Sequence, residues 1–457
     1  MNSFLPNYPL HNILKTDISI CSWNIHGNLQ MKIEDSDFLK CITPYDIIFL
    51  SECWFSKATC NSLELSGFKI YCKARSRKKK AKRDSGGLCV LIKNNICHYF
   101  EFLDWENEDG LIFKVNEKNT LLERDLYILF SYLRPNSSTR NDIENESDPF
   151  DILFQKVAEL RYNNELIIIG DLNSRTGNLQ DFFSIEESNF DPFDDDDYAN
   201  FCIDCNFLLQ NNIEIIRNNQ DKKTNDFGNR LINLCLVSGL LICNGRLEGD
   251  KDGKLTYIDK KGKSTNDYCL LSKGLLCLNN HFFVNELNVF SDHVPIVLKM
   301  YDFKFITNAN NVPNDMNNFV QGVSYYKWKS DFHNEFNLNM NDESVCKKFT
   351  DIISLLNNET DLLDNTLIEN CILELNDILE HVAYPLQHTY SSKSSDSCTA
   401  KHSQNTWYDN ECRAKNKEFK AARNLFFDTK CDVDLVNMCS IRNTYRKMCR
   451  KKNHPTK

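Results

Sequence analysis

The sequence contains no apolar run approaching the eighteen or so residues that a membrane-spanning helix requires, which excludes an integral membrane protein. It also lacks an apolar segment typical of a secretory signal near residue 1, so we expect the protein to work inside the cell. Its 20 cysteines are therefore expected to be reduced thiols and not a disulfide framework. The close pair Cys202 and Cys205 has no second Cys or His pair at zinc-finger spacing, which argues against a structural zinc site.

The composition is that of an ordinary globular protein, with 457 residues of which 41% are apolar and 26% are charged. The charge is unevenly distributed along the chain. Residues 401–457 hold 14 Lys and Arg against 6 Asp and Glu, a net charge of +8, whereas the whole chain carries −10. A basic C-terminal segment on an acidic body suggests contact with nucleic acid, although a charged helical surface would have the same composition.

Two helices are expected in this basic segment, with apolar faces that include Phe419 on one helix and Met438 on the other. The opposite faces carry basic residues that include Arg423 and Arg446, so the sequence predicts a helical hairpin with a basic outer face.

The strongest local signal is the stretch 167–177, Ile-Ile-Ile-Gly-Asp-Leu-Asn-Ser-Arg-Thr-Gly. Its three β-branched residues without polar alternation predict a central strand that is covered on both faces. Gly170 is expected to let the backbone turn sharply, so that Asp171 and Asn173 project beyond the strand end. A carboxylate and an amide there suit the orientation of a water or a phosphate. An Asx-type turn that caps the strand is the structural alternative.

Other predicted strands also end in polar residues. Strands are predicted at 17–23, 45–50, 88–92, 126–132 and 296–298, a helix at 151–160, and a helix followed by a strand at 229–243. A hairpin is predicted from 253 to 271, with its turn at 259–262 and Asp267 inside its second strand. The polar residues at or beside these strand ends are Asn24, Glu52, Tyr132, Asp267, Asp292 and His293.

Together these side chains have the chemistry of phosphodiester hydrolysis. A Glu and an Asp can hold a hard divalent cation such as Mg2+ through oxygen ligands. An Asp and an Asn can orient an attacking water, and a His backed by a carboxylate can present a charged donor to a phosphate.

The motifs resemble those of the endonuclease/exonuclease/phosphatase superfamily, which contains DNase I and the AP endonucleases. The matching strings, in the family's order, are Ser22-Trp23-Asn24, Glu52 after its apolar strand, Tyr132 with Pro135, Gly170-Asp171-Leu172-Asn173, Asn266-Asp267-Tyr268 and Ser291-Asp292-His293. The resemblance implies an α/β fold, a four-layer sandwich in which two mixed β-sheets pack face to face with helices outside. The site would lie at one end of the sheets.

Within that superfamily the chain looks most like the endonuclease domain of a LINE-like non-LTR retrotransposon polyprotein. The likeness is carried by the basic loop and Gly-Gly strand at 75–92, the turn Asn244-Gly245-Arg246 and the helix start Trp407-Tyr408-Asp409-Asn410-Glu411-Cys412. This last string and its basic helices resemble the connector that precedes the reverse transcriptase. We therefore expect a nuclease domain at 17–302 and a helical, basic connector region at 303–457, truncated or encoded apart from a polymerase.

The resemblance implies a metal site at Glu52, which would ligate Mg2+, or alternatively Mn2+, with support from Asp292 and Asn24. Two positions depart from the family pattern. AP endonucleases carry a metal-site Asp where this chain has His26, which argues against repair of abasic sites. Asn266 stands where the family has an apolar residue, so looser packing is expected there.

The resemblance also implies the roles of the remaining residues. Asp171 would activate or align the water, which Asn173 would orient. Tyr132 would contact the scissile phosphate, and His293, held by Asp267, would stabilise the charge on its oxygens.

Arg134, which follows Tyr132, and Thr256, in the predicted hairpin, are candidate substrate contacts. Thr256 is more simply explained as an ordinary β-sheet threonine. The basic run at 75–83 is a solvated loop, a nuclear-import signal or a phosphate contact. The acidic patch at 191–197 is expected to be an exposed loop.

The leading interpretation is a Mg2+-dependent DNA endonuclease that nicks its target and leaves a 3′-hydroxyl, as in target-primed retrotransposition. Its partners would be DNA, element RNA and a reverse transcriptase, and its location would be the nucleus, or the cytoplasm with entry into the nucleus. The alternatives are a phosphatase or phosphodiesterase of the same superfamily and a catalytically silent nucleic-acid-binding relic.

Overall fold

The computed structural model of the chain describes residues 12–15, 17–75, 84–135, 148–184, 203–307, 325–326, 340, 342–358, 375, 378, 387–388 and 409–453. Residues 76–83 of the basic run, the acidic patch at 191–197, and Trp407 and Tyr408 lie outside these ranges. The chain forms two compact units, one of residues 1–311 with 403–457 and one of residues 312–402. The C-terminal helices therefore belong to the unit that holds the sheets, whereas the sequence predicts a division after residue 302.

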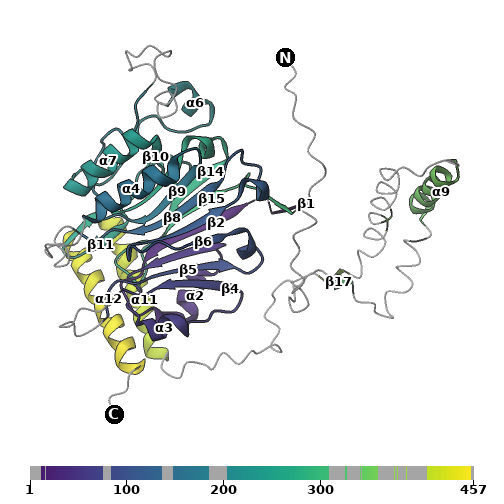
Figure 1. Ribbon diagram of the computed structural model, residues 1–457. Coiled ribbons are helices and arrows are strands. Elements are labelled where there is room, and N and C mark those ends of the chain that lie inside the picture. The colour runs from purple at the N-terminus through teal and green to yellow at the C-terminus, as the bar shows by residue number, and fades with distance from the viewer. Residues whose placement is uncertain are drawn as a thin grey trace. The chain divides into compact units, whose positions relative to one another are not determined.

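Two six-stranded mixed sheets form the centre of the first unit within the described residues (Figure 1). The first sheet contains, in spatial order, β14 (Asn280–Val284), β15 (Ile296–Met300), β2 (Ile18–Asn24), β3 (Ile47–Ser51), β5 (Leu88–Lys93) and β4 (Phe68–Lys73). The second contains β10 (Leu240–Ile242), β13 (Asp267–Ser272), β9 (Glu165–Asp171), β8 (Leu126–Tyr132), β7 (Gly110–Val115) and β6 (Glu101–Leu103). Each sheet has a parallel pair near its middle, β2 with β3 or β8 with β9, between antiparallel neighbours.

Strand β9 shows how the apolar sequence determines the layers. All seven of its residues are buried, which confirms the predicted central strand. Ile167 and Ile169 belong to the core between the two sheets, where Phe49 of the first sheet and Phe130 of the second have ring centroids 5.2 Å apart. Ile168 points the other way and belongs to a second core. Residues that alternate along the strand thus serve two different cores.

Helices cover the outer faces of both sheets. Phe150 of α4 (Pro149–Arg161) and Phe227 of α7 (Asp226–Ser238) belong to the second core, with ring centroids 5.5 Å apart. On the first sheet, Phe38 of α2 (Ser36–Ile42) stacks on Trp23 of β2 at 5.3 Å. This arrangement confirms the expected α/β sandwich.

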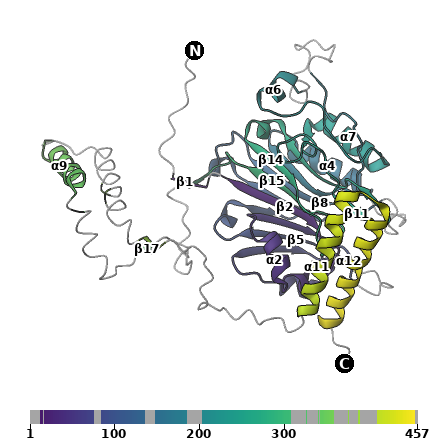
Figure 2. The ribbon, with the colours of Figure 1, turned by 180° about the vertical axis from the view of Figure 1, so that it is seen from behind.

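Helices α11 (Asn410–Thr429) and α12 (Asp432–Asn453) form the predicted helical hairpin, which Figure 2 shows as two helices side by side. Their predicted apolar faces are buried, with Phe419 1% exposed and Met438 0%. However, Arg423 and Arg446 do not lie on an outer face. Arg423 Nη1 donates to the carbonyl of Leu287 at 3.0 Å and Arg446 Nε to that of Val289 at 3.2 Å. The prediction of a basic outer face is therefore wrong for these two arginines, because they bind the body of the unit.

The predicted hairpin at 253–271 is divided between two structures. Strands β11 (Tyr257–Asp259) and β12 (Gly262–Ser264) pair with each other, whereas β13 joins the second sheet beside β9. Between them Thr265 Oγ1 donates to the Asn219 side chain at 3.1 Å, which holds the chain where it leaves the hairpin. Asp267 is thus the first residue of a sheet strand and not part of the hairpin.

The remaining described elements are short or lie in the second unit. They are β1 (Asn12–Lys15), α1 (Leu29–Lys32), α3 (Lys57–Asn61), α6 (Cys205–Gln210), β16 (Phe305–Thr307), β17 (Tyr325–Tyr326), α9 (Glu343–Asn358), β18 (Gln387–His388) and the 3-10 turns Cys97–Tyr99, Glu117–Asn119 and Lys273–Cys277. Strand β16 pairs with β1, so the region expected to be helical begins with a strand. Among the described helices, none combines the length and apolar character that crossing a membrane would take.

Candidate active site

The register of the strands brings the predicted polar residues together at one edge of the sheets. In the second sheet, Asp171 lies opposite Asp267 on β13 and opposite Tyr132 on β8. In the first sheet, Asn24 lies opposite Ser51, the residue before Glu52. Residues from distant parts of the chain therefore meet because their strands end together.

Asp171 is 1% exposed and uses its two carboxylate oxygens differently. Oδ1 accepts the backbone N–H of Asn173 at 3.0 Å, which is an Asx turn. Oδ2 accepts the side-chain amide of Asn24 at 2.9 Å and lies 3.8 Å from Nε2 of His293. The turn and the site are thus not alternatives, because one side chain contributes to both.

Gly170 is required by close packing and not by a turn. Strand β9 continues through Asp171, and a Cβ at Gly170 would lie 1.8 Å from the carbonyl oxygen of Ser131. The chain turns later, at Asn173 with φ 48°, a conformation that asparagine tolerates. Asn173 is anchored there because its side-chain nitrogen donates to the carbonyl of Leu133 at 2.7 Å. The predicted turn at Gly170 is therefore wrong by three residues.

His293 is 6% exposed and held on several sides. Its Nδ1 makes a hydrogen bond of 2.9 Å with Oδ2 of Asp267. Its backbone N–H donates to Oγ of Ser291 at 3.1 Å, and the indole nitrogen of Trp23 donates to its carbonyl at 3.0 Å. These contacts fix the imidazole with Nε2 directed towards Asp171.

The electrostatics of this cluster favour a charged histidine beside a carboxylate that titrates near neutrality. Burial and the carboxylate of Asp267 raise the pKa of Asp171 to about 7, against the opposing effects of His293 and Asn24. Burial lowers the pKa of His293, but Asp267 and Asp171 outweigh it and raise that pKa to about 10. At neutral pH the cluster therefore offers one charged donor and one carboxylate able to accept a proton.

Glu52 and Tyr132 meet beside this cluster, where Tyr132 is buried and Glu52 is partly exposed; we call these two residues and Asp292 the rim. The Tyr132 hydroxyl donates to Oε1 of Glu52 at 2.7 Å. Burial and the negative charges of Glu52 and Asp171 raise the pKa of Tyr132 well above its usual range, so the hydroxyl stays protonated. Glu52 has φ 53°, an unfavourable left-handed conformation for a glutamate, and such strain is concentrated at functional positions.

Asp292 lies on the same rim, beside two basic groups. Its Oδ1 is 3.2 Å from Nδ1 of His26 and 3.8 Å from Nη2 of Arg446. Burial alone would raise the pKa of Asp292, but His26 and Arg446 outweigh it and hold that pKa below its usual range. Burial lowers the pKa of His26. Arg446 comes from α12 and was not among the site residues that the sequence indicated.

The two predicted substrate contacts are buried. Thr256 is 0% exposed, and its Oγ1 accepts the backbone N–H groups of Asn266 at 3.0 Å and Asp267 at 3.1 Å. The predicted contact is therefore wrong for Thr256, which holds the start of β13 instead. Arg134 is 8% exposed and its Nε lies 3.0 Å from Asp109, so its contact with substrate stays a prediction.

Arg75 and Asp109 lie beside Tyr132; the sequence indicated Arg75 only as part of the basic run at 75–83 and did not indicate Asp109. The Arg75 guanidinium pairs with Asp109 and lies 5.3 Å from the centroid of the Tyr132 ring. No spacing in the sequence links these residues.

By contrast, Arg442, Arg446 and Arg450 recur every four residues, and this period could have identified the face of α12 that binds the body.

One group of side chains lies close enough together to hold a divalent cation, and the sequence predicts a different one. Among the described residues, one ligand atom each of Asp171, Asp267 and His293 lie within 4.8 Å of one another. Glu52 and Asp292, the predicted ligands, offer oxygen atoms only. A histidine with carboxylates suits a transition metal, whereas oxygen donors suit Mg2+.

No family model and no curated protein matches the chain. Solved structures do match. The endonuclease domain of TRAS1, a telomere-specific non-LTR retrotransposon, is 12% identical, with 63% of this chain and 99% of that chain covered and a TM-score of 0.37. The 3′-5′ exonuclease NExo from Neisseria meningitidis is 15% identical, with 62% and 99% covered and a TM-score of 0.38. The AP endonuclease LMAP from Leishmania major is 13% identical, with 63% and 88% covered and a TM-score of 0.42. Similarities this low do not assign an activity to the chain.

Proposed function

We propose that the chain is a divalent-metal-dependent endonuclease that hydrolyses a phosphodiester bond of DNA. It would nick its target and leave a 3′-hydroxyl, as in target-primed retrotransposition. The observation that carries this proposal is the buried contact of Asp171 with both Asn24 and His293, the latter held by Asp267. This arrangement supports the proposal, because phosphodiester hydrolysis requires a proton acceptor and a charged donor beside the reacting group.

In the proposed reaction, a water attacks the phosphorus as the bond to the 3′-oxygen breaks. Asp171 takes the proton of the water, while Asn24 holds the carboxylate in place. The amide oxygen of Asn173 orients the water, because its amide nitrogen is already bound to Leu133. The leaving 3′-oxygen is protonated by solvent.

The other side chains stabilise the phosphate as its negative charge increases. Nε2–H of His293 donates to a phosphate oxygen, and Asp267 keeps the imidazole charged and oriented. The protonated hydroxyl of Tyr132 is a second donor at the rim.

Glu52, with Asp292 and Asn24, would hold Mg2+ or Mn2+. Their oxygen donors fit a hard cation, which when bound would neutralise charge on the phosphate and polarise it. Asp171, Asp267 and His293 fit this role less well, because a histidine ligand must be neutral and the pKa of His293 is raised to about 10. Element RNA, a reverse transcriptase in trans and a nuclear location remain part of this proposal through the retrotransposon resemblance.

A plasmid assay tests the proposal. The purified chain should convert supercoiled plasmid to open circles in Mg2+ and not in EDTA, and a DNA polymerase should extend the nicks because they end in 3′-hydroxyls. His293→Ala should slow nicking by roughly 100- to 1000-fold, as loss of a charge-stabilising donor does. Asp226→Asn, at an exposed carboxylate in the first turn of α7, is the matched control and should nick normally.

Two outcomes would contradict the proposal. Nicking by His293→Ala at the wild-type rate would mean that the site is assigned wrongly. Release of phosphate from small esters without any nicking would favour the phosphatase alternative.

A further inference from the structure

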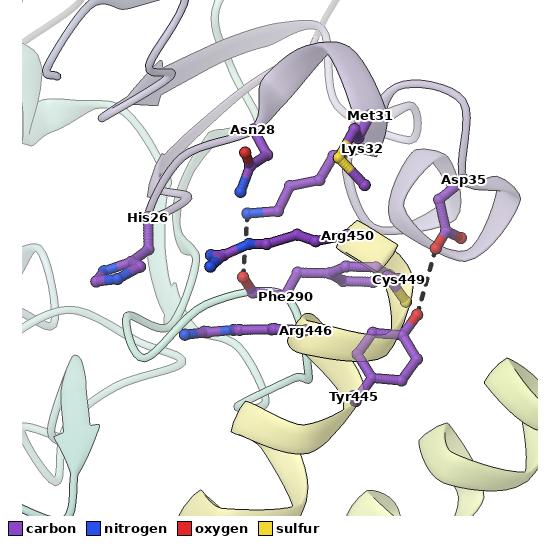
Figure 3. A pocket seen from close by; sticks show the side chains of 10 residues that line it. All are labelled: His26, Asn28, Met31, Lys32, Asp35, Phe290, Tyr445, Arg446, Cys449 and Arg450. Atoms are coloured by element: carbon purple, nitrogen blue, oxygen red, sulfur yellow. Dashed lines mark hydrogen bonds between the residues drawn. The ribbon is translucent and has the colours of Figure 1, made fainter. Parts of the chain in front are cut away.

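A small pocket of about 40 Å3 lies beside the candidate active site, between the loop after β2 and helix α12 (Figure 3). Since one water needs about 10–15 Å3, the pocket has room for about three waters. A group the size of one tetrahedral oxyanion fits this volume, whereas a base or a sugar does not.

One end of the pocket is cationic. Figure 3 shows the side chains of Lys32, Arg446 and Arg450 running side by side, with their nitrogen-bearing ends directed to the side where His26 lies. The acidic residue of the lining, Asp35, lies at the opposite end, where its Oδ2 accepts the hydroxyl of Tyr445 at 3.4 Å. Burial and the charge of Arg446 lower the pKa of Lys32 well below its usual range, so the positive charge at the end near His26 comes from Arg446 and Arg450.

One charged donor at this end is buried without an acceptor. Arg446 Nε donates to Val289 at 3.2 Å, but Nη2 of the same guanidinium makes no hydrogen bond with any described residue. The Asp292 carboxylate is 3.8 Å from Nη2, which is too long for a hydrogen bond. Lys32, in contrast, donates to the carbonyls of Ile25 and Phe290. A buried charged N–H without an acceptor is costly, and an anion in the pocket would relieve that cost.

The position of the pocket relates it to the candidate reaction. His26 and Arg446 both approach Asp292, the residue before His293. The pocket and the catalytic histidine therefore flank Asp292. In a nucleic acid the phosphates follow one another along the backbone, so a phosphate next to the reacting one is the anion that this placement would meet.

We propose that this pocket binds one backbone phosphate of the nucleic acid, next to the phosphate that is cleaved. Arg446 and Arg450 supply the charge and His26 closes the end towards the site. The inference rests on the proposed function and deepens it, because it makes the C-terminal helix part of the substrate-binding surface.

The salt dependence of DNA binding tests this inference. Binding of the full chain to a DNA duplex is measured in EDTA over a range of salt concentrations. In Arg446→Gln the slope of log K against log salt should fall by about 0.9, the value for one lost phosphate contact. Arg450→Gln, which leaves the contacts of Arg446 with Val289 and Asp292 intact, should act in the same direction. Lys447→Gln removes the same charge from an exposed position on α12 and should leave the slope unchanged.

Inorganic phosphate serves as a second probe. Calorimetry should show that the wild type binds it, that Arg446→Gln weakens this affinity about tenfold, and that saturating DNA duplex displaces it. Thermal unfolding of each variant confirms that the chain is folded.

Three outcomes distinguish a failure of this inference from a failure of the proposed function. Equal slopes for Arg446→Gln, Arg450→Gln and wild type would overturn the inference. Phosphate that binds through Arg446 but is not displaced by DNA would overturn the backbone assignment in favour of free phosphate. A chain that shows the expected slopes and displacement but never nicks plasmid would support this inference while contradicting the proposed function.

Discussion

The buried cluster and the rim of the candidate site lie at the same edge of the sheets but are built differently. The cluster consists of Asp171, Asp267 and His293, which are 1%, 1% and 6% exposed. Two of them are opposite partners across neighbouring strands, so sheet pairing alone sets their separation. The rim depends on residues that follow strand ends, where Glu52 has φ 53° and His26 has φ 52°.

The rim is also held from outside the sheets, by the far end of the chain. Arg442 donates to the carbonyl of Ile258 at 3.1 Å and to Oδ1 of Asp259 at 2.8 Å, and Arg446 approaches Asp292. The comparison indicates a division of labour. The sheets position Asp171, the proposed proton acceptor, while loops and α12 shape the region that would hold the cation and the substrate.

The variant expected to have the largest effect is Arg442→Met, which should destabilise the rim and not the buried cluster. Arg442 is 0% exposed, and its removal leaves Asp259 without its buried partner. The free energy of unfolding should fall by about 3–5 kcal/mol, as when a buried ion pair is broken. Urea denaturation measures this change. Lys452→Met breaks an exposed ion pair with Asp409 near the end of the same helix and should have little effect. Equal losses in the two variants would show that α12 is not anchored to the rim through Arg442.

The pH dependence of nicking should be determined by the residues of the buried cluster and not by those of the rim. The pKa of Asp171 is raised to about 7, so nicking should fall about tenfold per unit as the pH drops below 7 and Asp171 becomes protonated. The pKa of His293 is raised to about 10, so nicking should also fall as the pH rises through 10 and the imidazole loses its charge. Asp267→Asn removes the carboxylate that raises the pKa of His293.

In Asp267→Asn the alkaline limb of the pH profile should therefore move to lower pH. The two limbs belong to the coupled cluster as a whole. If the alkaline limb does not move in Asp267→Asn, the charge on His293 is not what limits nicking at high pH.

The raised pKa of His293 also affects the stability of the fold. A histidine pKa raised above the unfolded value of about 6.5 stabilises the fold fully below that pH, and this stabilisation is lost as the pH rises through 10.

A smaller effect, confined to the rim, is expected from Glu52→Gln. Loss of one charged ligand should raise the Mg2+ concentration for half-maximal nicking on the order of tenfold, with little change in the pH limbs. Titration with Mg2+ measures this change. Glu64→Gln, at an exposed position before β4, is the matched control. An unchanged Mg2+ requirement in Glu52→Gln would place the cation elsewhere, with Asp171, Asp267 and His293 as the other candidate set.

The buried cluster could be predicted from the sequence because apolar runs locate strands and the next polar residue marks the strand end. Asp171 follows this rule, and so do Asn24, which binds Asp171, and Tyr132 on the rim. Asp267 was assigned to the wrong strand pair, because the break between β12 and β13 depends on the hydrogen bond of Thr265 to the distant Asn219. Local pattern contains no information about such a partner.

The rim could be predicted only in part. Glu52 follows an apolar strand and was found, but its partners arrive from other segments. Asp109 belongs to a loop without any motif, and Arg446 lies on a helix whose basic residues looked like a solvated face. Thr256 was misassigned because the sequence does not show which way a threonine in a turn points. Long-range packing, and not local propensity, decides these positions.

The most direct test of the account is a double-mutant cycle of Asp171→Asn and His293→Ala, read as single-turnover nicking rates in Mg2+. If the two residues act as one unit, each single variant should lose roughly 100- to 10,000-fold, and the double variant should lose little more than the worse single variant. Losses that multiply in the double variant would contradict the account, because they would mean that Asp171 and His293 act independently.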